Sequence, residues 1–229
     1  MSHPRNRPPV TVEEERLAQR CAQGRVIVID DDADWCDAIA SALDLEGYAW
    51  ESHASALAFL SAQPQPAFPG PCCILCDVRM PGMDGLELQR RLLEQTTTPF
   101  LLISGESGAR EAAMAFRAGA LDFLTKPVAL DKLLEAIERA LVVSRERQSR
   151  AETMAEMRQR VARLTPRELH VVRLVVAGQT NPEIATTMHV ALRTAKLYRQ
   201  RAIEKLGVGT LADLVRMADA LGITRAQDP

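Results

Sequence analysis

Hydrophobic and polar positions follow two repeating patterns in the first half of the chain. Short runs of adjacent apolar residues, such as 26–29 and 72–76, are typical of strands buried on both faces of a parallel sheet. Between these runs, apolar residues recur at helical spacing, as Trp35, Ile39 and Leu43 do. Strands that alternate with helices predict an α/β fold with a doubly wound parallel sheet.

Each of the four strands that this pattern locates ends on a polar residue. The strand segments are "RVIVI", "CCILCD", "PFLLIS" and "LDFLTKP", and their polar endings are Asp30 with Asp31, Asp77, Ser104 and Lys126. One Asp after a strand is usually a turn or a helix cap. The carboxyl ends of parallel strands, however, share the sheet edge that holds the ligand site in such folds. Four polar endings therefore predict one shared site.

The carboxylates at this edge predict a Mg²⁺ site. Asp30 and Asp31 are hard oxygen ligands of the kind that Mg²⁺ prefers. The ion would also offset the repulsion between the two carboxylates. We interpret Asp32 as a solvated extra carboxylate rather than a ligand.

The same edge predicts phosphoryl chemistry. Lys126 offers a positive charge and Ser104 a hydroxyl donor, which together suit the oxygens of an incoming phosphoryl group. Asp77 is the predicted nucleophile, because it stands apart in the sequence from the other carboxylates and begins the loop "DVRMPGMDG". A phosphatase of the haloacid dehalogenase type would have a second Asp two residues later, but position 79 is Arg. We therefore expect a protein that is not an enzyme.

Four motifs in this half resemble the receiver domain of two-component response regulators. They are "VIVIDDD", "CDVRMPGMDG", "LLISGE" and "GALDFLTKP", within about Arg25 to Leu141. The resemblance implies a five-stranded, flavodoxin-like sheet and a sensor histidine kinase that donates a phosphoryl group to Asp77. It implies that Mg²⁺ is held by Asp30, Asp31, Asp77 and the backbone carbonyl of Arg79.

The resemblance also assigns switch positions. Ser104 stands at the switch Ser/Thr position and Phe123 at the aromatic switch position, where a plain core aromatic is the alternative interpretation. Lys126 stands at the invariant lysine position, and the Lys126–Pro127 peptide is expected to be cis. A phosphorylation-independent regulator with a relic receiver is the alternative function, but the acidic pair, the nucleophile and the lysine are all present.

The second half of the chain predicts four helices. Thr165 is the predicted cap of the first, with Pro166 at its first position and Glu168 completing a capping box. A short helix at 181–188, a tight turn and a longer helix at 193–206 form a helix-turn-helix. We expect three apolar residues to mark the buried side of the longer helix, namely Leu197, Ile203 and Leu206.

Charge divides the chain in the same place. Residues 25–145 contain 18 acidic and 10 basic residues, whereas residues 161–222 contain nine basic and five acidic ones. A charged helix is often only a solvated surface. Here the helix-turn-helix context and the nearly one-signed charge favour contacts with DNA phosphates and guanine edges.

This half resembles the LuxR-type helix-turn-helix domain through "LTPRE", "AGQTNPEIA" and "RTAKLYRQRAIEKLGV", over about Leu164 to Leu221. Together with the receiver, the chain resembles the NarL/FixJ family of response regulators. The departures are Ala191, which should weaken a helix cap by about 1 kcal/mol, Ala195, and Tyr198, which puts the usual base contact in doubt. The candidate DNA contacts are Thr180, Asn181, Arg193, Thr194, Lys196, Tyr198, Arg199, Arg201 and Lys205.

The resemblance implies a mechanism and a set of partners. Phosphorylation should rearrange the face that carries Phe123 and produce a homodimer, with the last helix, 211–221, as the contact of the DNA-binding part. The dimer should bind promoter DNA and regulate transcription, with RNA polymerase as a further expected partner.

We expect five segments along the chain. They are a mobile arm at 1–24 with a short helix from Thr11 to Cys21, the receiver at 25–141, a helical linker at 142–163, the DNA-binding domain at 164–222 and a tail at 223–229. The linker has no Gly or Pro, so the last receiver helix is expected to continue through it. The alternative is a helix broken near Gln148 or Ser149.

Other classes are disfavoured. No apolar run approaches the roughly 20 residues of a membrane span, and the N-terminus lacks the apolar core of a signal peptide, so we expect a cytoplasmic protein without a membrane partner. Cys73 and Cys76 form a CxxC, but no second pair exists for a zinc site. We interpret the cysteines as buried thiols.

Overall fold

The computed structural model describes residues 24–62, 70–93, 96–105 and 109–223. The predicted arm with its short helix at Thr11–Cys21, apart from Gly24, and the tail after residue 223 lie outside these residues. The chain divides into two compact units, one ending at Gln148 and the other beginning at Ser149. Each unit is described by itself.

The first unit is built on a parallel sheet, as predicted. Within the described residues the sheet has five strands in the order β2-β1-β3-β4-β5. They are β1 (Arg25–Ile29), β2 (Ala49–His53), β3 (Cys72–Asp77), β4 (Phe100–Ser104) and β5 (Asp122–Thr125). The chain runs from β1 outward to β2 and then back past β1 to β3. The strand order therefore reverses between β1 and β3, the place where open α/β sheets bind ligands.

The strand that the sequence analysis did not locate is β2, at the edge of the sheet. All residues of β3 and β4 are buried, as their continuous apolar runs predict. Along β2, "AWESH", burial alternates, because an edge strand is covered less completely. A segment of this kind lacks the continuous apolar run that predicts a buried strand.

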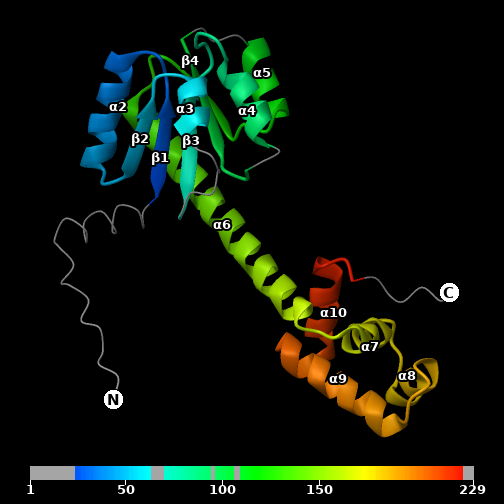
Figure 1. Ribbon diagram of the computed structural model, residues 1–229. Helices are drawn as coiled ribbons and strands as arrows, with labels where there is room; N and C mark the ends of the chain where they lie inside the picture. The colour runs from blue at the N-terminus through cyan, green and yellow to red at the C-terminus, as the bar shows by residue number, and fades with distance from the viewer. Residues whose placement is uncertain (1–23, 63–69, 94–95, 106–108, 224–229) are drawn as a thin grey trace, which may run out of the picture. The chain divides into compact units, whose positions relative to one another are not determined.

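Helices cover both faces of the sheet (Figure 1). One face packs against α2 (Ala33–Leu45) and the first turns of α6 (Leu130–Ala162). The other face packs against α3 (Ala56–Ala62), α4 (Gly85–Leu93) and α5 (Ala109–Arg117). Two apolar layers thus enclose the strands and leave their ends to carry polar groups.

Helix α6 is continuous over 33 residues and crosses the boundary between the two units. The alternative break near Gln148 or Ser149 does not occur. Three side chains near the boundary bind backbone atoms at or just before the starts of β3 and β4. The Ser144 hydroxyl accepts from the Cys72 N–H at 3.0 Å, Arg147 donates to the Thr97 carbonyl at 2.7 Å, and Gln148 donates to the Gly70 carbonyl. The start of the predicted linker is therefore part of the receiver unit.

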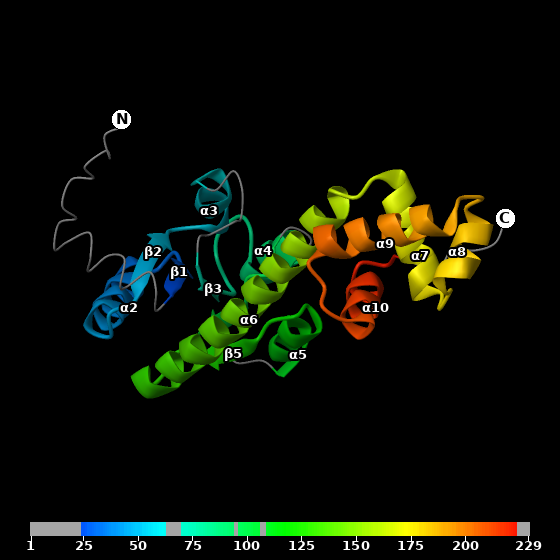
Figure 2. The same ribbon diagram turned by 90° about the horizontal axis from the view of Figure 1, so that it is seen from below.

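The second unit contains the four predicted helices (Figure 2). They are α7 (Pro166–Val176), α8 (Asn181–Thr187), α9 (Leu192–Leu206) and α10 (Leu211–Ala220). Their core includes Val171, Ile184 and Leu214, and Met157 and Val161 of α6 pack against it. The last turns of α6 are therefore part of this unit.

The starts of these helices differ in how they are capped. Thr165 and Glu168 form the predicted capping box at α7, and Thr210 and Asp213 form another at α10. Ala191 precedes α9 and provides no side-chain cap, as expected from its methyl group.

The predicted buried side of α9 was partly wrong. The buried residues are Ala195, Ala202 and Leu206, whereas the Leu197 side chain is 42% exposed. At 3.6 residues per turn, Leu197 lies about 200° around the helix from Ala195. An apolar side chain therefore stands on the side of α9 that faces away from the core.

The cysteines of β3 are buried. Cys72, Cys73 and Cys76 are free thiols inside the sheet, and burial raises the pKa of each of them. Cys36 of α2 is only partly buried, so the interpretation as a buried thiol does not hold there, and Cys21 lies outside the described residues. None of the helices in the described ranges combines the length and apolar composition that a membrane span requires.

Candidate functional site

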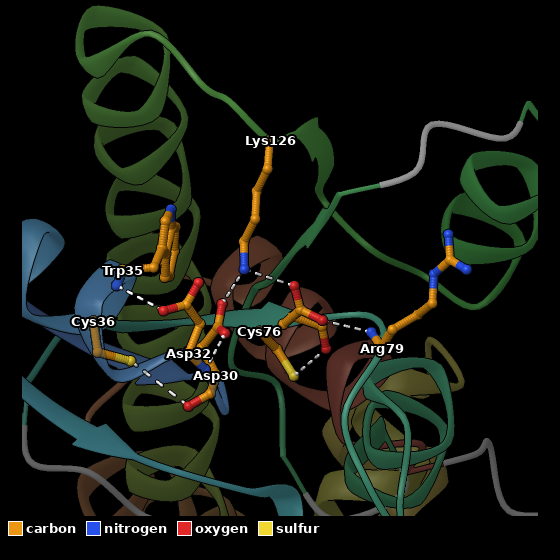
Figure 3. A network of polar contacts seen from close by, with 8 residues as sticks. Asp30, Asp32, Trp35, Cys36, Cys76, Arg79 and Lys126 are labelled. Atoms are coloured by element: carbon orange, nitrogen blue, oxygen red, sulfur yellow. Dashed lines mark hydrogen bonds and ion pairs between the residues drawn. The ribbon is translucent and has the colours of Figure 1, made fainter.

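The ends of three strands bring two carboxylates and one ammonium group together (Figure 3). Asp30 follows β1, Asp77 ends β3, and Lys126 follows β5. The Lys126 Nζ lies 2.5 Å from Asp30 Oδ2 and 2.9 Å from Asp77 Oδ1. The residues Asp30 and Asp77 are only 2% and 6% exposed. One positive charge thus offsets part of the negative charge of two buried carboxylates at the place where the strand order reverses.

Backbone N–H groups hold the remaining carboxylate oxygens. Asp30 Oδ1 accepts from the N–H of Asp32 at 3.0 Å, and Asp77 Oδ2 accepts from the N–H of Arg79 at 2.6 Å. Asp32 itself caps α2, because its Oδ1 accepts from the N–H of Trp35 at 3.1 Å. The third carboxylate of the sequence run thus fixes the start of a helix.

Burial and pairing set the charges at this site. Burial raises the pKa of Asp30, against the lowering effect of its hydrogen bonds from Lys126 and the Asp32 N–H. Burial alone would lower the pKa of Lys126, but its hydrogen bonds to Asp30 and Asp77 outweigh burial and raise it. The Lys126 side chain is therefore a fixed positive charge at neutral pH.

The other predicted receiver residues lie around Asp30, Asp77 and Lys126. Ser104 ends β4, is fully buried, and accepts the Lys126 N–H at its carbonyl oxygen at 2.8 Å. Asp31 is exposed and lies with Asp30 on a hollow of about 160 Å³. Phe123 of β5 is partly buried against the core cluster under α3, α4 and α5. The Lys126–Pro127 peptide is cis, as predicted.

The donors at this edge fit a small divalent cation. In the described part of the chain, no three His, Cys, Asp or Glu side chains stand close enough together to hold a metal ion. Mg²⁺, however, usually binds one or two carboxylates and keeps several waters. Asp30 and Asp77 already converge on one ammonium, so their oxygens can approach one ion. The roles of Asp31 and the Arg79 carbonyl as ligands stay predictions.

One residue of the site was missed from the sequence. The Trp35 ring lies over the Lys126 ammonium, with Nζ 4.4 Å from the ring centroid (Figure 3). The sequence pattern accounts for Trp35 only through the apolar spacing of its helix. Its position over the lysine depends on the Asp32 cap, which sets where α2 begins.

In the second unit, α9 presents cationic side chains. Arg193, Lys196 and Arg201 are exposed on this helix, and Thr194 is partly buried. Arg199 donates to Asn181 Oδ1 at 3.1 Å and so joins α9 to the start of α8. Thr180 precedes α8, and its N–H and hydroxyl both donate to Glu183.

Two further candidate DNA contacts, Tyr198 and Lys205, also have partners within the unit. The Tyr198 ring packs against the core, and its hydroxyl accepts from Arg167 at 3.1 Å. Lys205 Nζ lies 2.6 Å from Oε2 of the buried Glu168. The hydrogen bond from Lys205, followed by that from the Thr165 N–H, lowers the pKa of Glu168. A DNA contact by Tyr198 or Lys205 stays a prediction.

Comparisons with known proteins agree with this arrangement. Residues 26–138 match the response regulator receiver domain, and residues 162–218 match the bacterial regulatory proteins of the luxR family. Transcriptional regulatory protein FixJ of Bradyrhizobium diazoefficiens is 37% identical over 203 residues, which are 88% of this chain and 97% of that protein. Response regulator protein TodT of Pseudomonas putida is 34% identical over 198 residues, 86% of each chain.

A solved structure extends the similarity to the fold. The low-resolution structure of response regulator StyR has a TM-score of 0.76 at 33% identity, covering 85% of this chain and 98% of that one. Both halves are therefore matched in sequence and in fold. The chain belongs to the NarL/FixJ family of two-component response regulators: it joins a receiver domain to a LuxR-type DNA-binding domain and regulates transcription.

Proposed function

We propose that Asp77 accepts a phosphoryl group from a sensor histidine kinase, and that this modification switches the protein to a DNA-binding dimer. The observation that carries the proposal is the convergence of Asp30 and Asp77 on the ammonium group of Lys126. A buried carboxylate beside a fixed cation is suited to attack phosphorus while the cation balances the charge on the phosphoryl oxygens.

The transfer exchanges one bond to phosphorus for another. An Asp77 carboxylate oxygen forms the new O–P bond while the P–N bond to the kinase histidine breaks. Lys126, which already lies 2.9 Å from Asp77, pairs with a phosphoryl oxygen, and the Ser104 hydroxyl donates to another. Mg²⁺, held by Asp30, Asp31, Asp77 and the Arg79 carbonyl, would supply further positive charge to the same oxygens.

The phosphorylated protein then acts through its receiver face and its DNA-binding unit. The charge added at the sheet edge draws Ser104 and Lys126 toward it, and the face that carries Phe123 rearranges and pairs with a second receiver. Two DNA-binding units in one dimer bind paired half-sites more tightly, since the second contact becomes intramolecular. We propose that the dimer binds promoter DNA and contacts RNA polymerase, and that it does so in the cytoplasm. In this proposal the protein acts as a switch and not as an enzyme.

Intact mass tests the first step. The full chain is incubated with Mg²⁺ and acetyl phosphate, and Asp77→Asn is compared with Asp34→Asn, a control at an exposed carboxylate on α2. We expect one phosphoryl adduct on the wild type and on Asp34→Asn, and none on Asp77→Asn or in EDTA. If no adduct forms with acetyl phosphate or with an active kinase, the receiver is a relic and the switch is wrong.

DNA binding tests the second step. The affinity of the wild type for promoter fragments is measured with and without phosphorylation, at one fixed salt concentration. We expect tighter binding and a dimer mass only for the phosphorylated protein. Equal affinities would show that DNA binding is independent of the receiver.

A further inference from the structure

The Trp35 ring covers the ammonium group of Lys126 at the receiver site. Its centroid lies 4.4 Å from Lys126 Nζ, well inside the distance at which an aromatic face attracts an ammonium group. Trp35 belongs to the first turn of α2, where its N–H donates to Asp32. The ring also packs against the core cluster between α2, α6 and the sheet. The indole is therefore held in place from two sides.

The ring completes the surroundings of the ammonium group. An ammonium group has three donors, and Asp30 and Asp77 each receive a hydrogen bond from Lys126. The Lys126 side chain is only 19% exposed, so little water competes for the third N–H donor of the ammonium group. An aromatic face attracts the cation without accepting a strong hydrogen bond. The lysine is thus kept at the carboxylates and can still exchange one of them for a new anionic partner.

We infer that Trp35 is a positioning residue for phosphoryl transfer: its indole holds the Lys126 ammonium against Asp77, where the phosphoryl group arrives. This inference rests on the proposed phosphorylation of Asp77. Without the ring, Lys126 moves among more positions and is less often placed to neutralise the phosphoryl oxygens. The rate of transfer then falls, although the carboxylates and the lysine are all retained.

Two substitutions separate the π face from the packing. Trp35→Phe keeps an aromatic face over the lysine, whereas Trp35→Leu keeps an apolar side chain against the core but has no π face. We measure the initial rate of adduct formation with Mg²⁺ and acetyl phosphate by intact mass, and urea unfolding of each protein as the test of packing. We expect Trp35→Leu to be about fivefold slower than wild type and Trp35→Phe to stay within about twofold.

A second measurement tests the contact without phosphorylation. Trp50 is the other tryptophan of the chain, so Trp50→Phe leaves Trp35 as the sole indole. A neighbouring ammonium group quenches indole fluorescence by proton transfer. In the Trp50→Phe protein, Lys126→Met should therefore raise the emission of Trp35, while Lys132→Met, at an exposed lysine on α6, should leave it unchanged.

The outcomes distinguish this inference from the proposed function. Equal rates for Trp35→Phe and Trp35→Leu, at equal stability, would overturn the positioning role and leave the phosphorylation of Asp77 intact. Unchanged emission in Lys126→Met would overturn the contact itself. The absence of any adduct on the wild type would overturn the proposed function and this inference with it.

Discussion

Gly85 begins α4 at a place where the backbone leaves no room for a side chain. A Cβ at this position would lie 2.2 Å from the Asp77 carbonyl oxygen and 3.1 Å from Cys76 Sγ. The Gly85 N–H also donates to the Val78 carbonyl at 2.9 Å, which ties the helix start to the end of β3. The substitution Gly85→Ala therefore drives a methyl group into the backbone of the predicted phosphoacceptor.

The size of the effect follows from this distance. Relief of the 2.2 Å contact requires the two backbone segments to separate, and neither is a flexible side chain that could turn away. Overpacking of this kind costs about 3 kcal/mol. The lower entropy of alanine in the unfolded chain returns about 0.5 to 1 kcal/mol. We expect Gly85→Ala to lower the free energy of unfolding by about 2 kcal/mol.

Urea unfolding followed by circular dichroism measures this loss. The matched control is Gly105→Ala, because a Cβ at Gly105 would have no neighbour within 4 Å. It should change the free energy of unfolding by less than about 0.5 kcal/mol. The reasoning is refuted if Gly85→Ala is as stable as Gly105→Ala.

Three further predictions concern charged groups. Lys126→Met leaves two buried carboxylates without a counter-charge and should lower the free energy of unfolding in EDTA by about 3 kcal/mol. Mg²⁺ should largely restore this free energy. A loss of unfolding free energy as small as that of the exposed Lys132→Met would contradict the prediction. The folded pKa of Glu168 is lowered, so its stabilisation is present above the ordinary Glu pKa and disappears as the pH falls through the folded pKa. Thermal unfolding should thus depend less on acid pH in Glu168→Gln, and an unchanged profile would count against the ion pair. Arg201→Ala should reduce the salt slope of DNA binding by about one phosphate contact, and a slope equal to that of the wild type would exclude such a contact.

The predictable part of the receiver lies at the strand ends. Asp30, Asp77 and Lys126 could be grouped from the sequence because a parallel sheet places the carboxyl ends of its strands along one edge. No side-chain geometry is needed for that inference. The hydrogen bonds that orient the carboxylates involve neighbouring backbone N–H groups and depend on local turns, which residue type alone does not determine.

The parts that could not be predicted depend on helix register. Trp35 stands over Lys126 because α2 starts at a particular residue, and Leu197 is exposed because α9 turns its alanines inward. Both leucines and alanines fit an apolar stripe, so spacing alone allowed the wrong face. The Glu168–Lys205 pair joins the start of α7 to the end of α9, and this requires the packing angle of two helices.

The reactivity of the β3 thiols reports local opening of the receiver unit. A covered, protonated thiol does not react with oxidants or alkylating reagents. Cys73 packs under α2 and α6 and Cys76 under α3, α4 and α5, so each thiol can react only when the covering helices move away from the sheet. The rate of their modification therefore reports how often these layers open. Oxidation of these two thiols is then confined to molecules that have already opened, and closed molecules keep the strand that carries Asp77 chemically intact.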